Sequence, residues 1–119
     1  QAHPKVLRVR YPMLAGSPGH AVAVQQMAMG GGMLSFELHT GFEGAMVLMN
    51  RLQLIVRAIS LGDTDSLIMH PGAFMQAMQK QNPQARLSEG VTMGLMRLSV
   101  GLEDCADLLA DLDQALEAV

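Results

Sequence analysis

Three short segments of this chain alternate apolar and polar residues, and this two-residue period constrains the fold more than any other feature. The segments are residues 5–11 (KVLRVRY), 33–39 (MLSFELH) and 94–100 (GLMRLSV). Side chains two residues apart share one face of a strand, so each segment predicts a strand with one buried and one polar face. Two further short apolar runs, 56–61 and 66–70, flank a turn signal and predict two strand-like pieces joined by a tight loop.

Helical signals lie between the strand segments. A Ser-Pro pair at 17–18 predicts the start of a short helix that stops at the glycines of 30–32. Thr40 and Glu43 have the spacing of a capping box. Apolar residues then recur at helical intervals as far as Ile59, which predicts a long helix with one apolar stripe.

The second half of the chain is less regular. Residues 72–92 mix Gly, Gln, Asn and Pro and predict a long loop, in which a short helix around Met75 and Met78 ends before Asn82-Pro83. A last helix is expected over 103–118, because acidic residues in a first turn suit the positive end of the helix dipole.

This order of elements predicts an α+β fold with two layers. A small, mainly antiparallel sheet is covered by helices on one face, because amphipathic strands bury only one of their faces. A chain of 119 residues is the usual size of one domain, so we expect one domain over 1–119.

Composition excludes several classes of protein. Half of the residues are apolar and 16% are charged, which excludes intrinsic disorder. The net charge of −3 disfavours a nucleic-acid partner, and no apolar run approaches the length of a membrane span. The one cysteine, Cys105, excludes an internal disulfide and favours a reducing, cytoplasmic compartment.

Methionine and histidine are the residue types that could bind a metal here. The chain has 11 methionines and 3% aromatic residues, so methionine is expected to fill the core, with a Cu(I) carrier as the alternative. The four histidines are scattered over different elements without the spacing of a zinc motif, so we expect no metal site.

Arg97 is the candidate functional residue on the strand at 94–100. A strand arginine can simply face water. An arginine held on a rigid strand is also suited to a carboxylate, because its planar fork pairs with both oxygens. Ser60 could add a hydroxyl or a backbone donor, and composition and spacing leave both interpretations of Arg97 open.

Three blocks of sequence resemble one enzyme family. They are GFEGA at 41–45, SLGDTDSLI at 60–68 with its following His-Pro, and RLSVGLED at 97–104. Together they resemble the C-terminal domain of the Cys/Met-metabolism family of pyridoxal-phosphate enzymes. That family includes cystathionine γ-synthase, the cystathionine lyases, O-acetylhomoserine sulfhydrylase and methionine γ-lyase. The motif sequences most resemble those of methionine γ-lyase and cystathionine γ-synthase.

The resemblance implies the role of this domain and of three residues. The whole of 1–119 would be the small C-terminal domain of a fold-type I enzyme, following a large pyridoxal-phosphate domain that this chain lacks. Arg97 matches the arginine that binds the substrate α-carboxylate, and Ser60 with the backbone of Leu61 matches its companion contact. The parent would be a cytoplasmic lyase or transferase of sulfur amino acids or homoserine esters, and a homotetramer.

The resemblance also shows what the chain lacks. The family binds its cofactor through a lysine in a Ser/Thr-rich motif, and neither Lys5 nor Lys80 stands in such a motif. We therefore expect no catalytic and no cofactor-binding residue in this chain, and no activity from the chain alone. A non-enzymatic amino-acid-binding or assembly module is the alternative.

One stretch departs from the family pattern. After His-Pro the family usually has small residues ending in Thr-His, where this chain has GAFMQ at 72–76, with Met75-Gln76 at the last two positions. The resemblance places this stretch at the active-site entrance, so a bulkier and more apolar entrance is expected. Which sulfur substrate is used, and whether it undergoes elimination or replacement, stays open.

Overall fold

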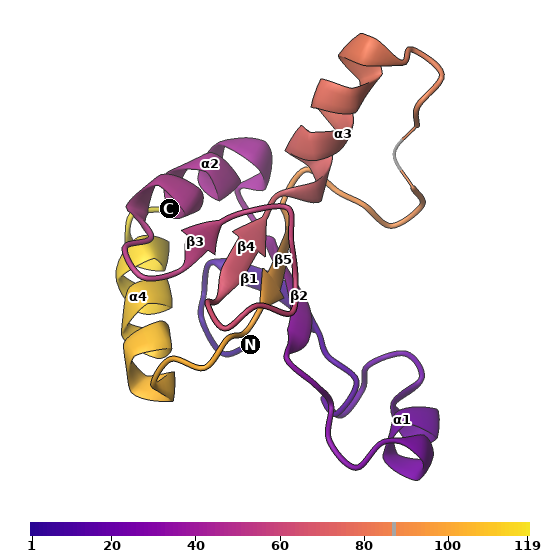
Figure 1. The fold of residues 1–119 in the computed structure, drawn as a ribbon, viewed down its shortest axis with the longest axis vertical. Coiled ribbons are helices and arrows are strands. Elements are labelled where there is room, and N and C mark those ends of the chain that lie inside the picture. Colours follow the sequence, from indigo (N-terminus) through magenta and orange to yellow (C-terminus); the bar gives the residue numbers. More distant parts are fainter. Residues whose placement is uncertain (87) are drawn as a thin grey trace.

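The computed structural model describes residues 1–86 and 88–119, which form five strands and four helices. In chain order they are β1 (Val6–Arg10), α1 (His20–Gln26), β2 (Met33–Leu38), α2 (Gly41–Arg51), β3 (Val56–Arg57), β4 (Leu67–Met69), α3 (Pro71–Gln81), β5 (Leu95–Ser99) and α4 (Cys105–Glu117). Figure 1 shows β1–β5 at the centre, with α1 and α3 projecting from it. The α+β class predicted from the sequence is confirmed.

The five strands form one sheet in the order β1-β2-β5-β4-β3. The pairs β1–β2, β2–β5 and β4–β5 are antiparallel, and only β3–β4 is parallel. The sheet is therefore mainly antiparallel, as the alternating strands predicted. Because β3 and β4 run the same way, the chain between them has to cross the sheet to start β4.

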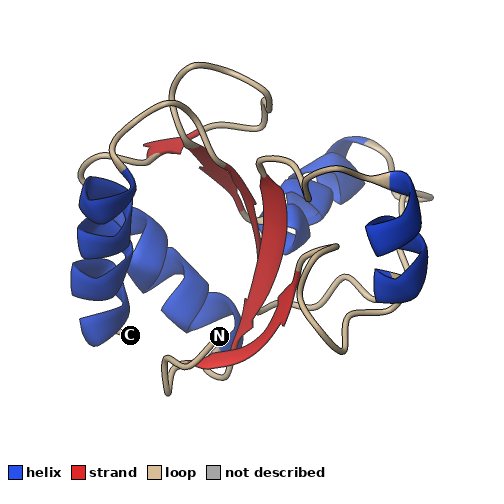
Figure 2. Ribbon diagram, turned by 90° about the horizontal axis from the view of Figure 1, so that it is seen from below, coloured by secondary structure: helices blue, strands red, loops and turns tan. Residues whose placement is uncertain are grey.

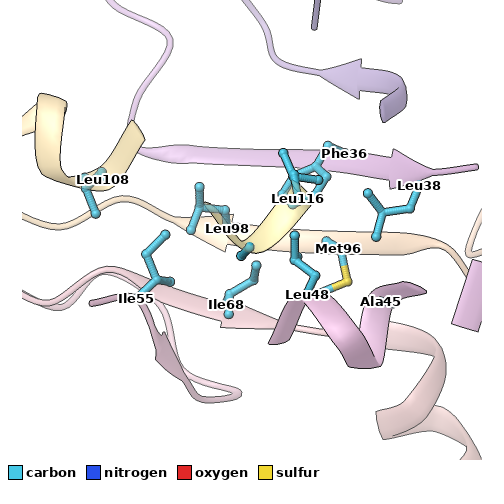
Figure 3. Packing of buried hydrophobic residues seen from close by; sticks show 11 residues of the cluster. Phe36, Leu38, Ala45, Leu48, Ile55, Ile68, Met96, Leu98, Leu108 and Leu116 are labelled. Atoms are coloured by element: carbon cyan, nitrogen blue, oxygen red, sulfur yellow. The ribbon is translucent and has the colours of Figure 1, made fainter. Parts of the chain in front are cut away.

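The hydrophobic core lies on one face of this sheet, under α2 and α4. Figure 2 shows the sheet on edge with these two helices on one side of it. Figure 3 shows the side chains that meet there: Phe36, Leu38, Met96, Leu98 and Ile68 from the strands, Ala45 and Leu48 from α2, Leu108 and Leu116 from α4, and Ile55. Leu48, Ile68 and Met96 are fully buried, so this face is closed to solvent.

Helix α2 ends at Arg51, and the prediction that it continues to Ile59 is wrong. The backbone turns extended at Leu52, and Asp111 of α4 then accepts the N–H groups of Gln53, Leu54 and Ile55 at 2.8, 3.0 and 2.9 Å. A carboxylate from another helix thus satisfies donors that would otherwise continue the helical ladder.

Asp111 stays ionised in this position. Burial raises the pKa of Asp111 and is the largest single effect, but hydrogen bonds from the three N–H groups and from Gln114 together outweigh it. The pKa of this carboxyl is therefore below its ordinary value.

Residues 71–81 are helical, so the prediction of one long loop over 72–92 is wrong. The side chain of His70 caps this helix, α3, because its Nδ1 accepts the N–H of Ala73 at 2.7 Å. Pro71 takes the first helical position, where its missing N–H costs nothing. The polar composition of this segment favoured a loop, so most of the helix was not predicted. The helix ends with Asn82 as its C-cap, which agrees with the predicted break.

The outer helices contribute little to the core. Helix α1 begins at His20, later than the predicted Ser17-Pro18 start, and none of its residues is buried. Together with α3 it lies on the side of the sheet opposite α2 and α4 (Figure 2). In the part of the chain that the structure describes, no helix is long and apolar enough to cross a bilayer.

Two sequence expectations about core side chains need correction. A register irregularity between Val6 and Arg8 turns Leu7 outward, where it is 51% exposed, although the alternation placed it on the buried face. Methionine fills the core at Met96 as expected, but Met29 is 80% exposed, so core packing does not explain every methionine.

Candidate functional site

The second face of the sheet carries three polar side chains and one methionine in register, and we call it the Arg97 face. Strand pairing aligns Arg10 of β1 with Ser35 of β2, Ser35 with Arg97 of β5, and Arg97 with Met69 of β4. Residues directly opposite one another project to the same face, so these four side chains form one row across the sheet. Arg97 stands near the middle of this row, on a strand that is paired on both sides.

Two backbone carbonyls hold the guanidinium of Arg97. Its Nη2 donates to the carbonyl of Ile59 at 2.6 Å and to that of Ser60 at 3.0 Å. A guanidinium has five N–H donors, so Nη1 and Nε keep donors that these two contacts do not use. A cation held in this way at a partly exposed position can bind an anion with little loss of side-chain entropy.

The carbonyls that hold Arg97 belong to the crossing loop, residues 58–66, which joins β3 to β4. In Figure 1 this loop passes over the strands before entering β4. The N–H of Gly62 donates to the hydroxyl of Ser99 at 2.9 Å, and Ser99 follows Arg97 on the same face of β5. The loop therefore lies over the Arg97 face and not beside it.

A buried carboxylate lies next to this row. Glu37 of β2 accepts the hydroxyl of Thr92 at 2.6 Å and Nη2 of Arg8 at 3.0 Å, and it is 7% exposed. The Thr92 hydroxyl lowers the pKa of Glu37 most, burial raises it, and Arg8 lowers it further, so the pKa is below its ordinary value. The negative charge of Glu37 is thus already paired with Arg8, and among the described residues no carboxylate forms an ion pair with Arg97.

The structure brings two of the three predicted site residues into contact. Arg97 meets Ser60 through the serine carbonyl, a contact that the sequence did not predict. The hydroxyl or backbone donor that Ser60 was expected to offer a carboxylate stays a prediction. Leu61 follows in the same loop and is 55% exposed. Sequence reasoning missed the carbonyl of Ile59 and the hydroxyl of Ser99. Ser99 had a usable signal, because it lies two residues after Arg97 on an alternating strand.

An apolar groove borders the start of the crossing loop and includes Met69 of the row described above. It has a volume of about 360 Å³, and Met46 and Met49 of α2, Ile59 of the loop, and Ala73 and Phe74 of α3 help to line it. Phe74 belongs to the stretch that departs from the family pattern, whereas Met75 is half-buried outside the groove wall. The departure therefore places an aromatic ring near the loop that holds Arg97.

The residues present do not form an anchor for pyridoxal phosphate. The chain has two lysines: Lys5 donates to the carbonyl of Val119, and Lys80 lies exposed in the last turn of α3. Among the described residues, neither lysine forms a hydrogen bond with Arg97 or the crossing loop. In the described part of the chain, no cluster of three or more His, Cys, Asp or Glu side chains is placed to hold a metal ion. The Arg97 face thus suits an anion such as a carboxylate and offers no amine for a covalent cofactor.

Comparisons with curated proteins find close relatives over almost the whole chain. Identity is 48% over 117 residues with L-methionine gamma-lyase of Fusobacterium nucleatum subsp. polymorphum, covering 98% of this chain and 29% of that protein. It is 48% over 115 residues with L-methionine gamma-lyase of Pseudomonas putida, covering 97% and 28%. A cystathionine gamma-synthase of Mycobacterium bovis is 44% identical over 114 residues, covering 96% and 28%.

Solved structures share the fold. The crystal structure of metB from Corynebacterium glutamicum superposes with a TM-score of 0.83 at 39% identity, covering 98% of this chain and 29% of that one. A putative O-acetylhomoserine (thiol)-lyase from Campylobacter jejuni, with N'-pyridoxyl-lysine-5'-monophosphate, has a TM-score of 0.78 at 36% identity, covering 98% and 24%.

These relatives are much longer than the present chain, which spans 29% of the length of the curated relative from Fusobacterium. The model of one family, described as "Cys/Met metabolism PLP-dependent enzyme", matches residues 1–117. With the fold, the arginine-bearing sheet and the relatives in agreement, this chain belongs to the Cys/Met metabolism family of PLP-dependent enzymes.

Proposed function

We propose that this chain is the small C-terminal domain of a PLP-dependent enzyme of sulfur amino acid metabolism, and that Arg97 binds the α-carboxylate of the substrate. The observation that carries the proposal is the anchoring of Arg97, whose Nη2 is held by the carbonyls of Ile59 and Ser60 while Nη1 and Nε keep donors. An arginine oriented before binding suits a planar anion, because carboxylate oxygens accept charge-assisted hydrogen bonds in fixed directions.

The cofactor chemistry belongs to another part of the enzyme. Pyridoxal phosphate supplies an electron sink when bound, and the protein orients the substrate against it. Among the residues that the structure describes, neither lysine contacts the Arg97 face, so that face has no amine to hold the cofactor. Arg97 would therefore help to orient the substrate. The large domain of the full-length enzyme would supply the cofactor lysine, and the assembled enzyme would be a cytoplasmic homotetramer.

The names of the relatives and the lining of the groove support a substrate class. Two of the relatives described are named methionine gamma-lyases, and the groove beside the crossing loop is lined by methionine, isoleucine and phenylalanine side chains. We assign an amino acid with a sulfur-containing or esterified side chain, handled by a lyase or transferase reaction. Phe74 would make the entrance bulkier and more apolar than in the usual family pattern.

Substitution of Arg97 in the full-length enzyme tests the carboxylate role. Arg97→Ala should raise KM for the amino-acid substrate by about 10- to 100-fold, because losing a hydrogen bond to a charged group costs about 1.5–3 kcal/mol. Arg51→Ala, an exposed arginine in the last turn of α2, is the matched control and should leave KM unchanged. Unchanged kinetics in Arg97→Ala would overturn the assignment.

A second experiment uses the 119-residue chain alone. After incubation with pyridoxal phosphate and dialysis, we expect no bound cofactor absorbance and no cofactor trapped by borohydride. Calorimetry with methionine should likewise show no binding at millimolar concentration. Stoichiometric trapping of the cofactor would contradict the proposal, and tight methionine binding by the chain alone would favour an amino-acid-binding module instead.

A further inference from the structure

A second acidic residue, Glu103, clasps the far end of the crossing loop. Its Oε1 accepts the N–H of Ser66 at 2.6 Å and its Oε2 accepts the hydroxyl of Ser66 at 2.8 Å. The Ser66 hydroxyl in turn accepts the N–H of Gly101 at 2.8 Å, and its side chain is fully buried. The N–H of Ser66 is the strongest effect that lowers the pKa of Glu103, so the clasp holds a charged carboxylate at neutral pH.

The chain that carries Glu103 lies tightly against this loop. The N–H of Leu102 donates to the carbonyl of Thr64 at 2.8 Å. A methyl group added to Gly101 would lie 2.2 Å from the carbonyl oxygen of Thr64, so only glycine permits this approach. Residues 101–103 therefore dock as a unit on residues 64–66, directly after strand β5.

The loop depends on these contacts for its position. Its first residue, Ala58, is fixed by its N–H to the carbonyl of Ile68 at 3.1 Å, and Gly62 is fixed to Ser99. Residues 59–65 are exposed and contribute nothing to the core. The carbonyls of Ile59 and Ser60, which orient Arg97, thus lie on a span held by hydrogen bonds at its start, middle and end.

We propose that Glu103 is a positioning residue for Arg97, acting through Ser66 and the crossing loop; its catalytic consequence rests on the carboxylate role proposed above. Glu103 is not the helix cap, because Asp104 caps α4 by accepting the N–H of Ala106 at 2.7 Å. Its carboxylate contacts neither Arg97 nor the remaining donors of that arginine. Its effect on substrate binding therefore passes through the position of the loop.

The first test needs only the 119-residue chain. In Glu103→Ala, hydrogen exchange measured by NMR should become at least about tenfold faster at the Gly62 amide, and the Nη signals of Arg97 should average as its rotation speeds up. Neither group touches Glu103, so both report the loop. Asp65→Asn, an exposed acid of the same loop, is the control and should change neither. Unchanged exchange and unchanged Arg97 signals in Glu103→Ala would overturn the proposal.

Glu103→Gln provides a second variant if the alanine variant does not fold. The amide keeps an acceptor for the Ser66 N–H and loses the acceptor for its hydroxyl. We expect the same changes at Gly62 and Arg97, smaller in size. A folded glutamine variant with wild-type exchange at both groups would count against the clasp.

The second test measures kinetics in the full-length enzyme. Glu103→Ala should raise KM about fivefold or more, and this increase should vanish when Arg97 is already alanine, because residues acting in one network are not additive. An equal increase in both backgrounds would refute the positioning role while leaving the carboxylate role intact. If Arg97→Ala itself leaves KM unchanged, the proposed function fails, and the exchange experiment still decides the structural part.

Discussion

Replacing Asp111 with alanine should destabilise this domain more than any other single change to a charged residue on α4. Its carboxylate accepts three consecutive backbone N–H groups, those of Gln53, Leu54 and Ile55, and also the side-chain amide of Gln114 at 3.0 Å. The aspartate is 6% exposed and its bond to the N–H of Ile55 is buried, so little water would reach that donor after the substitution. The change thus removes the group that ends α2 and leads the chain into β3.

The expected loss is about 3–5 kcal/mol in the free energy of unfolding. A hydrogen bond to a charged group contributes about 1.5–3 kcal/mol, and bonds that share one carboxylate do not add fully. The bond to Ile55 is buried, and an orphaned buried donor costs about 1–3 kcal/mol, whereas water can reach the donors of Gln53 and Leu54. Such a loss is a large share of the roughly 5–15 kcal/mol that stabilises a typical domain.

Urea denaturation at neutral pH, followed by far-ultraviolet circular dichroism, measures this loss. The chain has no tryptophan, so fluorescence would report little. Asp113→Ala is the matched control, because Asp113 is an exposed acid on the same helix; its change should stay within about 0.5 kcal/mol. If Asp111→Ala lost less than about 1 kcal/mol, the N–H groups of 53–55 would have another partner and the reasoning would be refuted.

Three further predictions concern stability. The pKa of Asp111 is lowered in the folded state, so this carboxylate stabilises the fold above its unfolded pKa and stops doing so as pH falls. In urea titrations between about pH 5 and pH 2, the free energy of unfolding should therefore fall less for Asp111→Asn than for the wild type. Gly101→Ala places a methyl 2.2 Å from the Thr64 carbonyl and should cost at least about 2 kcal/mol by thermal unfolding. A methyl group at Gly62 would meet no neighbouring atom, so Gly62→Ala should lower the free energy of unfolding by only about 1 kcal/mol, the cost of its positive φ of 72°. An equal loss for the two glycine variants would contradict the packing argument. Leu48→Ala should cost about 3 kcal/mol, since this side chain is fully buried, and a loss below 1 kcal/mol would mean the site collapses around it.

The strands were the most predictable part of this fold. Alternation over 33–39 and 94–100 placed Phe36 and Met96 on the buried face and Arg97 on the polar one, and the register of β2 with β5 agrees. This works because the side-chain period of a strand is set by local backbone geometry. Leu7 shows the limit, because one register irregularity moved it to the surface.

The helix boundaries were less predictable, for a physical reason. The apolar stripe from Ala45 continues to Ile59, yet α2 ends at Arg51, because Asp111, distant in sequence, takes the N–H groups of the next turn. In α3 the sequence was too polar to indicate a helix, and a histidine side chain supplied its cap. The contacts of Asp111 join residues 56 to 58 positions apart, so no local pattern contains them. The His70 cap is local, three residues from Ala73, but histidine is not among the usual N-cap residues and was not recognised as one.

The sequence by itself determined the α+β class, the polar face that carries Arg97, and the family, because both strand alternation and the family motifs consist of consecutive residues. The tertiary structure alone decided how Arg97 is held. The carbonyls of Ile59 and Ser60 reach it only because the chain crosses the sheet to start a parallel strand. Two hydrogen bonds fix this crossing loop, one from Gly62 to Ser99 and one from Ser66 to Glu103, and each joins residues 37 positions apart. Backbone carbonyls have no signature in sequence, so their position is known only when the chain is folded.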